Sequence, residues 1–281
     1  RLLDGKAEHG PHAVLLTPGG GVFERSLKTI KLTPQIKAAL DVTQDSMTPA
    51  ELMKAVLMAP ADLLFFGGIG TYVKAKPESS AEVGDRANDA IRIDAGQVRA
   101  KVIGEGANLG VTQRGRIEYG LLGGRGNTDA VDNSAGVDTS DHEVNIKILL
   151  GDIVAAGDMT TKQRNTLLES MTDEVAQLVL RDNYEQSQIL SIQELQGATG
   201  IDQHGAMMRD LERAGRLDRA IEFLPDDEAL AQRLAQGKGL TRAEMAVLLA
   251  YSKMALYDAL LPSDLPDDKL LEADLVGYFP R

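Results

Sequence analysis

The sequence contains no cysteine, and its apolar stretches are all short. The absence of cysteine excludes disulfide bonds, thiolate catalysis and cysteine-ligated zinc or iron–sulfur sites. Stretches such as residues 246–251 fall far short of the roughly 20 apolar residues that a bilayer requires. The amino end, residues 1–5, lacks the apolar region of a signal peptide. We therefore expect a soluble protein of the reducing cytoplasm without a membrane partner.

Positive charge is also scarce. Lysine and arginine number 30 against 42 acidic residues, which gives a net charge of -12. This charge repels a phosphate backbone, and no basic stripe with interleaved aromatic residues is present. Nucleic acid is therefore not an expected partner. A length of 281 residues, 43% of them hydrophobic, is enough for two domains with buried cores.

Glycine punctuates the first part of the chain, where buried strands alternate with helices. Thr48-Pro49-Ala50-Glu51 is a capping box that predicts a helix, and residues 61–66 form an apolar run typical of a strand buried on both faces. Residues 100–103 predict a second strand and residues 128–131 a weaker third one. Helical segments are expected around residues 112–122 and 140–150. This order predicts an α/β fold with an open, mostly parallel sheet.

The last part of the chain is poor in glycine and reads as successive amphipathic helices. The composition shifts near residues 151–158, so we expect an α/β domain over residues 1–157 and a helical domain over residues 158–281. A capping box at Thr241–Glu244 predicts the start of one helix. The helices expected here span residues 162–182, 184–196, 205–213, 227–235 and 242–261.

Three polar or glycine-rich loops follow the predicted strands. They contain Gly67 and Gly68, residues 104–110, and residues 133–136. Open parallel sheets bind ligands at the carboxyl ends of their strands, so these loops are expected along one rim. Residues 101–110 first suggest a dinucleotide fingerprint, but the glycine spacing is one residue too long. On these residues alone, a structural turn and a ligand loop are equally acceptable readings.

Two motifs carry a resemblance to a known family. Gly104-Glu105-Gly106-Ala107-Asn108 resembles the Glu-Gly-Ala-Asn loop of glutamate dehydrogenases, and residues 128–140 are similar to the family stretch Pro-Asp-x-x-x-Asn-Ala-Gly-Gly-Val-x-x-Ser. Residues 62–74 and 141–147 are similar to the very large NAD-specific bacterial members. Ser134-Ala135 and residues 109–112 depart from the shorter members and match this large subtype. The resemblance extends from about Gly19 to the end of the chain.

The resemblance implies a partial Rossmann-like NAD-binding domain and the activity of an NAD-dependent dehydrogenase. The activity is the NAD-dependent oxidative deamination of L-glutamate to 2-oxoglutarate and ammonia, in a homo-oligomer. Asn108 and Asn133 would hydrogen-bond the nicotinamide half of NAD, while Val137 would border the substrate and Ser140 would bind its distal carboxylate. Read without the family, Asn133 and Ser140 are turn and cap residues. The residues implied to bind the cofactor are Gly67, Gly68, Gly106, Ala107, Asn108 and Asn133.

No catalytic residue is expected in this chain. In the family a lysine polarises the 2-oxo group and an aspartate moves protons, and no segment here resembles the lysine motif. We expect both residues, together with the phosphate-binding turn, upstream of Arg1. Both ends of the chain look cut, and because these residues are expected outside it, the chain alone is expected to be inactive.

Two charged clusters have simpler explanations than a site. Asp138, Asp141, His142 and Glu143 resemble metal ligands, but carboxylates in a first helical turn already offset the helix dipole, so no metal is expected. Residues 85–92 form a charged patch expected to be solvated or to contact another subunit.

Two other functions stay open. A related amino-acid dehydrogenase would share the cofactor domain, although Ser140 favours a substrate with a distal carboxylate. A non-catalytic helical assembly or regulatory module would use the glycine loops only as tight turns.

Overall fold

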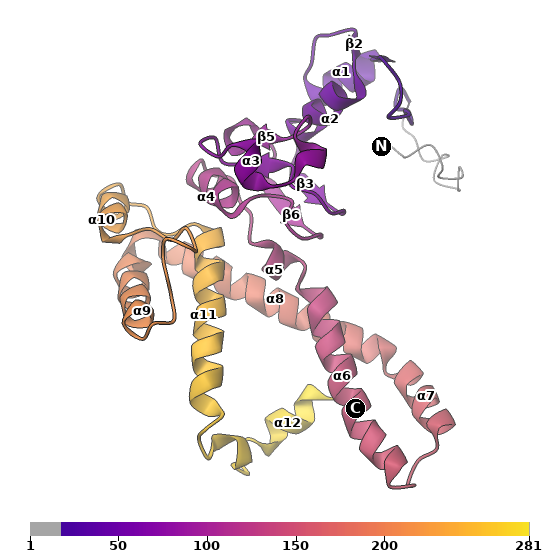
Figure 1. Ribbon diagram of the computed structural model, residues 1–281, viewed down its shortest axis with the longest axis vertical. Helices are drawn as coiled ribbons and strands as arrows, with labels where there is room; N and C mark the ends of the chain where they lie inside the picture. The colour runs from indigo at the N-terminus through magenta and orange to yellow at the C-terminus, as the bar shows by residue number, and fades with distance from the viewer. Residues whose placement is uncertain (1–17, 281) are drawn as a thin grey trace. The chain divides into compact units, whose positions relative to one another are not determined.

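We describe a computed structural model of the chain, over residues 18–280 (Figure 1). The amino end, on which the signal-peptide expectation rests, lies outside the described residues. The chain divides into two compact units, Arg1–Gly126 and Asn127–Arg281, here called the first and the second unit. The predicted domain boundary after residue 157 stays a prediction.

The first unit combines short strands with short helices. Three two-stranded sheets are present among its described residues: β1–β2 is antiparallel, whereas β3–β6 and β4–β5 are parallel. In chain order the elements are β1 (Ile30–Lys31), α1 (Pro34–Leu40), β2 (Ser46–Met47), α2 (Pro49–Leu57), β3 (Leu63–Phe66), β4 (Val73–Lys74), α3 (Ser80–Val83), η2 (Arg86–Asn88), β5 (Ile93–Asp94), η3 (Ala95–Gln97), β6 (Val102–Glu105) and α4 (Gln113–Leu121).

The predicted helices and two predicted strands of the first unit are confirmed. The capping box at Thr48 is formed in both directions, because its hydroxyl accepts from the Glu51 amide while the Glu51 carboxylate accepts from the Thr48 amide. Strands β3 and β6 pair in parallel. The expectation of burial on both faces of β3 was wrong, since Leu63 and Phe65 are 55% and 62% exposed. One face of this strand is thus only partly covered by the described chain.

Two apolar clusters form the core of the first unit. One joins β3, β4, β5 and β6 to α4 through residues such as Phe66, Val73 and Ile103. The other joins β1 and β2 to α1 and α2 and includes Ile30 and Leu52. The coarse α/β prediction agrees with these parallel pairs and their covering helices.

The second unit consists of helices and the turns that join them, with no strand among its described residues. Helix α8 runs beside α6, and α11 packs against α8 (Figure 1). Its elements are α5 (Asp129–Asp132), α6 (Ser134–Ala155), α7 (Thr161–Ser170), α8 (Thr172–Gln196), η4 (Gly197–Gly200), α9 (Ile201–Arg213), α10 (Asp227–Ala235), α11 (Arg242–Leu260), η5 (Leu265–Asp267) and α12 (Glu272–Tyr278).

Three details of this unit differ from the sequence prediction. Residues 128–131 form no strand, because Thr128 caps the short helix α5 and Val131 packs into the helical core. The helix expected to end at Asp182 continues to Gln196, and a break at Met171 divides α7 from α8 instead. Helix α6 begins at Ser134, six residues before the expected start.

The core of the second unit gathers apolar side chains from α8, α9, α10 and α11, among them Leu190, Met208 and Leu230. The predicted capping box at Thr241 is confirmed, and its Glu244 is completely buried. Both carboxylate oxygens of Glu244 accept hydrogen bonds from Arg233 at 2.7 Å, so this buried charge is compensated. Among the described residues, no helix is long and apolar enough to cross a membrane.

Candidate functional site

The predicted cofactor loops of the first unit meet at one edge of the β3–β6 sheet. Phe66 and Glu105 are partners in the parallel register, so Gly67 and Gly106 leave the two strands at the same end. This end is the carboxyl edge, where parallel sheets bind ligands. The structure therefore brings Gly67 and Gly68 together with the loop that contains Gly106, Ala107 and Asn108.

A buried ion pair fixes the Gly106–Gly110 loop. Glu105 is 1% exposed and accepts hydrogen bonds from Arg116 Nε at 2.6 Å and Nη2 at 2.9 Å. Its Oε1 also accepts from the Val111 amide at 3.0 Å. Because Glu105 precedes the loop and Val111 follows it, one carboxylate holds both ends of the loop against α4. Sequence reasoning quoted Glu105 only as part of a motif and missed this role.

The backbone of this loop makes a close approach at Gly106. A Cβ atom there would lie 2.2 Å from Cζ of Phe65, whereas a Cβ on Gly68 would meet no atom within 4 Å. The ring of Phe65 therefore covers the chain at Gly106, and Gly68 borders open space. Asn108 is exposed, and Leu109 adopts a left-handed φ of 60°. This conformation is unfavourable for a branched residue, so the loop is held in shape by its anchors.

The turn after Gly68 is anchored by the charged patch at residues 85–92. The Thr71 amide donates to Asp85 Oδ2 at 2.8 Å, and Arg92 Nε donates to the Thr71 carbonyl at 2.9 Å. Arg92 is buried and also pairs with Asp89 at 2.5 Å. The expectation of a solvated patch was wrong for Arg92, because its guanidinium group satisfies backbone carbonyls inside the fold.

An apolar cavity of about 680 Å3 opens beside Gly67 in the first unit. Its walls come from α1, α2 and the β3 strand, and Gly67 is the predicted cofactor residue on its lining. A cavity of this size and polarity accommodates a small-molecule group. The lining includes Phe23, Leu40, Leu52, Val56, Phe66 and Tyr72.

The other predicted residues lie in the second unit. Asn133 joins α5 to α6, and Val137 and Ser140 follow on α6 at helical spacings of four and three residues, which places them on one helix face. Val137 and Ser140 are exposed. Ser140 lies in the second turn and not at the helix start, and its hydroxyl donates to the Gly136 carbonyl at 3.1 Å. Ser140 is therefore not the helix-cap residue that a reading without the family makes it.

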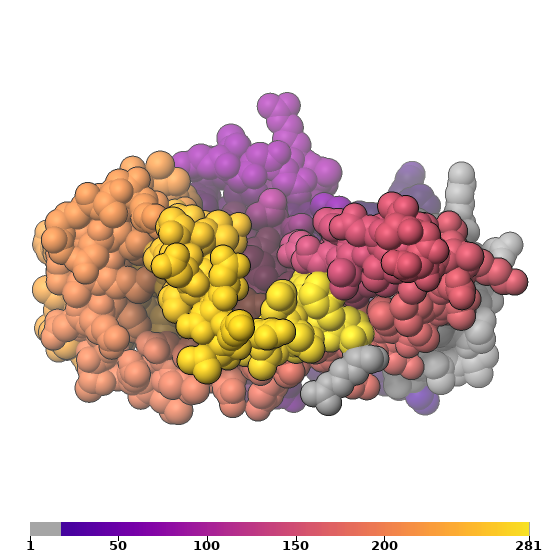
Figure 2. All heavy atoms as spheres, turned by 90° about the horizontal axis from the view of Figure 1, so that it is seen from below, coloured from indigo at the N-terminus to yellow at the C-terminus, as the bar shows by residue number. Residues whose placement is uncertain are grey.

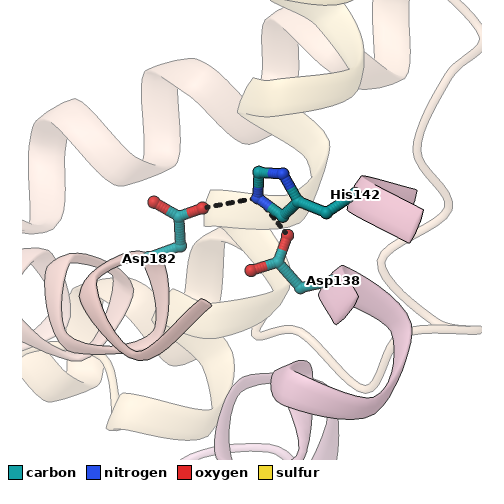
Figure 3. A group of neighbouring side chains, drawn as sticks. All are labelled: Asp138, His142 and Asp182. Carbon is teal, nitrogen blue, oxygen red and sulfur yellow. Dashed lines mark ion pairs between the residues drawn. The ribbon is translucent and has the colours of Figure 1, made fainter. Parts of the chain in front are cut away.

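Behind this face, three ionisable side chains of the second unit converge. Asp138 and His142 are one turn apart on α6, and Asp182 comes from α8 (Figure 3). His142 Nε2 lies 4.0 Å from Asp138 Oδ1 and 3.9 Å from Asp182 Oδ2. Burial, followed by repulsion from Asp182, raises the pKa of the Asp138 carboxyl above its ordinary value. Asp182 follows His142 by 40 residues, so no sequence spacing indicated this arrangement.

Comparison with known proteins decides the family. The family model for the catalytic domain of bacterial NAD-glutamate dehydrogenase matches residues 9–193, more than half of the chain. The chain belongs to the bacterial NAD-glutamate dehydrogenase family. A second model, for the C-terminal region of glutamate dehydrogenase, matches residues 237–281.

Three relatives in this family are named NAD-specific glutamate dehydrogenase. The chain is 55% identical to the Pseudomonas aeruginosa protein, 50% to the Halomonas elongata protein and 49% to the Mycobacterium tuberculosis protein, over 95% of its own length in each case. It spans only 16 to 17% of the length of these relatives. The resemblance read from the motifs is confirmed, and every predicted site residue lies inside the catalytic-domain match.

Proposed function

We propose that the protein carrying this chain oxidatively deaminates L-glutamate to 2-oxoglutarate and ammonia with NAD. The observation that carries this proposal is the catalytic-domain match over residues 9–193, together with the glycine loops at a parallel-strand edge. Three relatives whose names state this specificity support it. A partial Rossmann-like domain over residues 1–157, a helical domain over residues 158–281, a homo-oligomer and a cytoplasmic location are proposed with it, on the resemblance and composition.

The cofactor edge suits a dinucleotide in its chemistry. Glycines at the ends of β3 and β6 permit backbone to approach a ligand closely, and the open space at Gly68 leaves room for one. When bound, NAD supplies the acceptor for hydride. We assign Gly67, Gly68, Gly106 and Ala107 to shaping this edge.

Polar side chains would then orient the ligands. We assign Asn108 and Asn133 to the nicotinamide half of the cofactor, because an amide both donates and accepts hydrogen bonds. Val137 would border the substrate side chain, and the Ser140 hydroxyl would donate to its distal carboxylate in place of the Gly136 carbonyl. We assign the chain no catalytic residue, so its share of the reaction is to bind and orient.

The test is an activity assay on a full-length protein that contains this chain. We expect NADH formation with L-glutamate and little with L-leucine, which separates glutamate from the branched-chain substrates of related dehydrogenases. An Asn133→Ala variant should lose turnover, since the nicotinamide would be less well oriented. Preference for L-leucine would reassign the substrate, and absence of binding of either NAD or glutamate would favour a non-catalytic module.

A further inference from the structure

The cluster of Asp138, His142 and Asp182 places a buried histidine between two partly exposed carboxylates. His142 is 2% exposed, and neither of its ring nitrogens has a hydrogen-bond partner among residues 18–280; the same holds for Asp138 Oδ2. The separations of 3.9 and 4.0 Å between Nε2 and the two carboxylates are too long for hydrogen bonds. Leaving buried polar atoms unpaired is unfavourable, so this arrangement calls for a ligand.

The usual explanation for carboxylates near a helix start does not apply here. Helix α6 begins at Ser134 and has no acidic residue in its first turn. Asp138 therefore gains no stabilisation from the helix dipole, whose influence is confined to the terminal turn. Arg181 lies 4.0 Å from the other oxygen of Asp182, but its side chain is 59% exposed and it also faces Glu185. Asp182 thus has only this exposed arginine beside it, and Asp138 forms no ion pair with a lysine or arginine of residues 18–280.

We propose that Asp138, His142 and Asp182 form a binding site for a divalent transition-metal ion of the zinc class. The three ligand atoms all lie within 4.8 Å of one another, and the buried Nε2 of His142 points between the two carboxylates (Figure 3). Zinc held at about 2.0 to 2.2 Å from each ligand separates them by about 3.4 Å, so small rotations of the carboxylates complete the site. Three protein ligands leave a further coordination position for water.

The ligand set selects among metals. Calcium and magnesium prefer sites made of oxygen atoms, whereas an imidazole nitrogen suits zinc and its first-row neighbours. Two carboxylates also neutralise a divalent charge that a single histidine leaves uncompensated. The site goes beyond the proposed dehydrogenase reaction, in which this chain supplies only binding residues.

A metal here would fasten α6 to α8 at the place where α12 packs against α6. Asp138 and His142 belong to α6 and Asp182 to α8, while Tyr278 of α12 stacks on the His142 ring at a centroid distance of 4.5 Å. Asn145 of α6 also donates to the Tyr278 hydroxyl at 2.8 Å. Figure 2 shows α12 lying against α6 on this side of the second unit. The role we assign to the metal is therefore structural.

The experiment is a calorimetric titration of the metal-stripped 281-residue chain with Zn2+ alone. His9 and His12 are replaced by Gln in every sample, so that only His142 and His204 remain. We expect one Zn2+ per chain, at least 100-fold weaker binding in the His142→Gln and Asp182→Asn variants, and unchanged binding in His204→Gln. His204 is the matched control, because it is also buried but its Nε2 already contacts Gln193.

A second measurement keeps the proposal independent of folding defects. Thermal unfolding followed by circular dichroism should show that Zn2+ raises the midpoint of the parent chain and of His204→Gln but not that of His142→Gln. Visible absorption of bound Co2+ should appear in the same two samples only. Equal Zn2+ binding by the parent chain and His142→Gln, or no binding by either, overturns the proposal.

Discussion

The first and the second unit each hold a group of ionisable side chains with buried atoms, and the two groups differ in how these atoms are partnered. In the first unit, Glu105 receives a bidentate ion pair from Arg116 and a backbone amide. In the second, His142 and Asp138 have buried atoms with no partner within the described chain. A group whose hydrogen bonds are complete serves the fold, whereas an incomplete group has capacity to bind something else.

The largest effect on stability is expected from removing Glu105, whose hydrogen bonds are complete. Glu105→Ala removes the buried carboxylate that accepts two hydrogen bonds from the Arg116 guanidinium group, so the free energy of unfolding should fall by about 3 to 5 kcal/mol in urea titrations. Asp62→Ala removes an exposed partner of Lys101 and should leave stability unchanged. Similar losses in both variants would contradict the special position of Glu105.

The next effect separates binding on α6 from helix stability. In a full-length protein, Ser140→Ala should raise KM for glutamate by about 10 to 100-fold, since a hydrogen bond to a charged group contributes about 1.5 to 3 kcal/mol. Ser170→Ala is the matched control, because Ser170 is also exposed and bonds a carbonyl of its own helix. Both variants are measured by steady-state kinetics. An equal KM for glutamate in Ser140→Ala and Ser170→Ala would refute the assignment of Ser140.

A smaller effect on stability is expected from removing the charge of Asp138, whose Oδ2 has no hydrogen-bond partner in the described chain. The raised pKa of Asp138 means that its charged form is disfavoured in the folded state, so ionised Asp138 lowers stability near neutral pH. In metal-free buffer, Asp138→Asn should therefore raise the free energy of unfolding by on the order of 1 kcal/mol. A loss of stability in chemical denaturation at pH 7 would show that the charge has a partner after all.

The smallest effect concerns an ion pair that is neither buried nor incomplete. Hydrogen bonds from Arg219 lower the pKa of Glu212 below its ordinary value of 4.5. The stability it contributes is therefore fully present above pH 4.5 and is lost as the pH falls through the lower folded value. Between pH 7 and 3, unfolding midpoints should decline less steeply for Glu212→Gln. If the unfolding midpoint of Glu212→Gln fell with pH as steeply as that of the parent chain, Glu212 would not contribute to the loss of stability in acid.

Local signals predicted much of the fold. Capping boxes at Thr48 and Thr241 depend on residues three positions apart, and both form as expected. Residues 128–131 misled the prediction, because a four-residue apolar and acidic segment is compatible with either a strand or a helical turn. The exposure of Leu63 and Phe65 also escaped the prediction, since the covering of a strand depends on other parts of the chain.

The motifs identified the family and the candidate residues, but long-range partners were beyond them. Arg116 reaches Glu105 from the next helix, and Asp182 reaches His142 from a helix 40 residues later. No local pattern encodes such pairs, because they arise only when the elements pack. The same limit applies to Ser140, whose position in α6 depended on where that helix begins.

The stack of Tyr278 on His142 also provides a place for an optical reporter. The chain contains no tryptophan, so a Tyr278→Trp chain would carry a single indole directly against the imidazole ring. Its emission would come from that one contact without background from other indoles. The light emitted by this side chain would then follow the docking of α12 on α6 in real time.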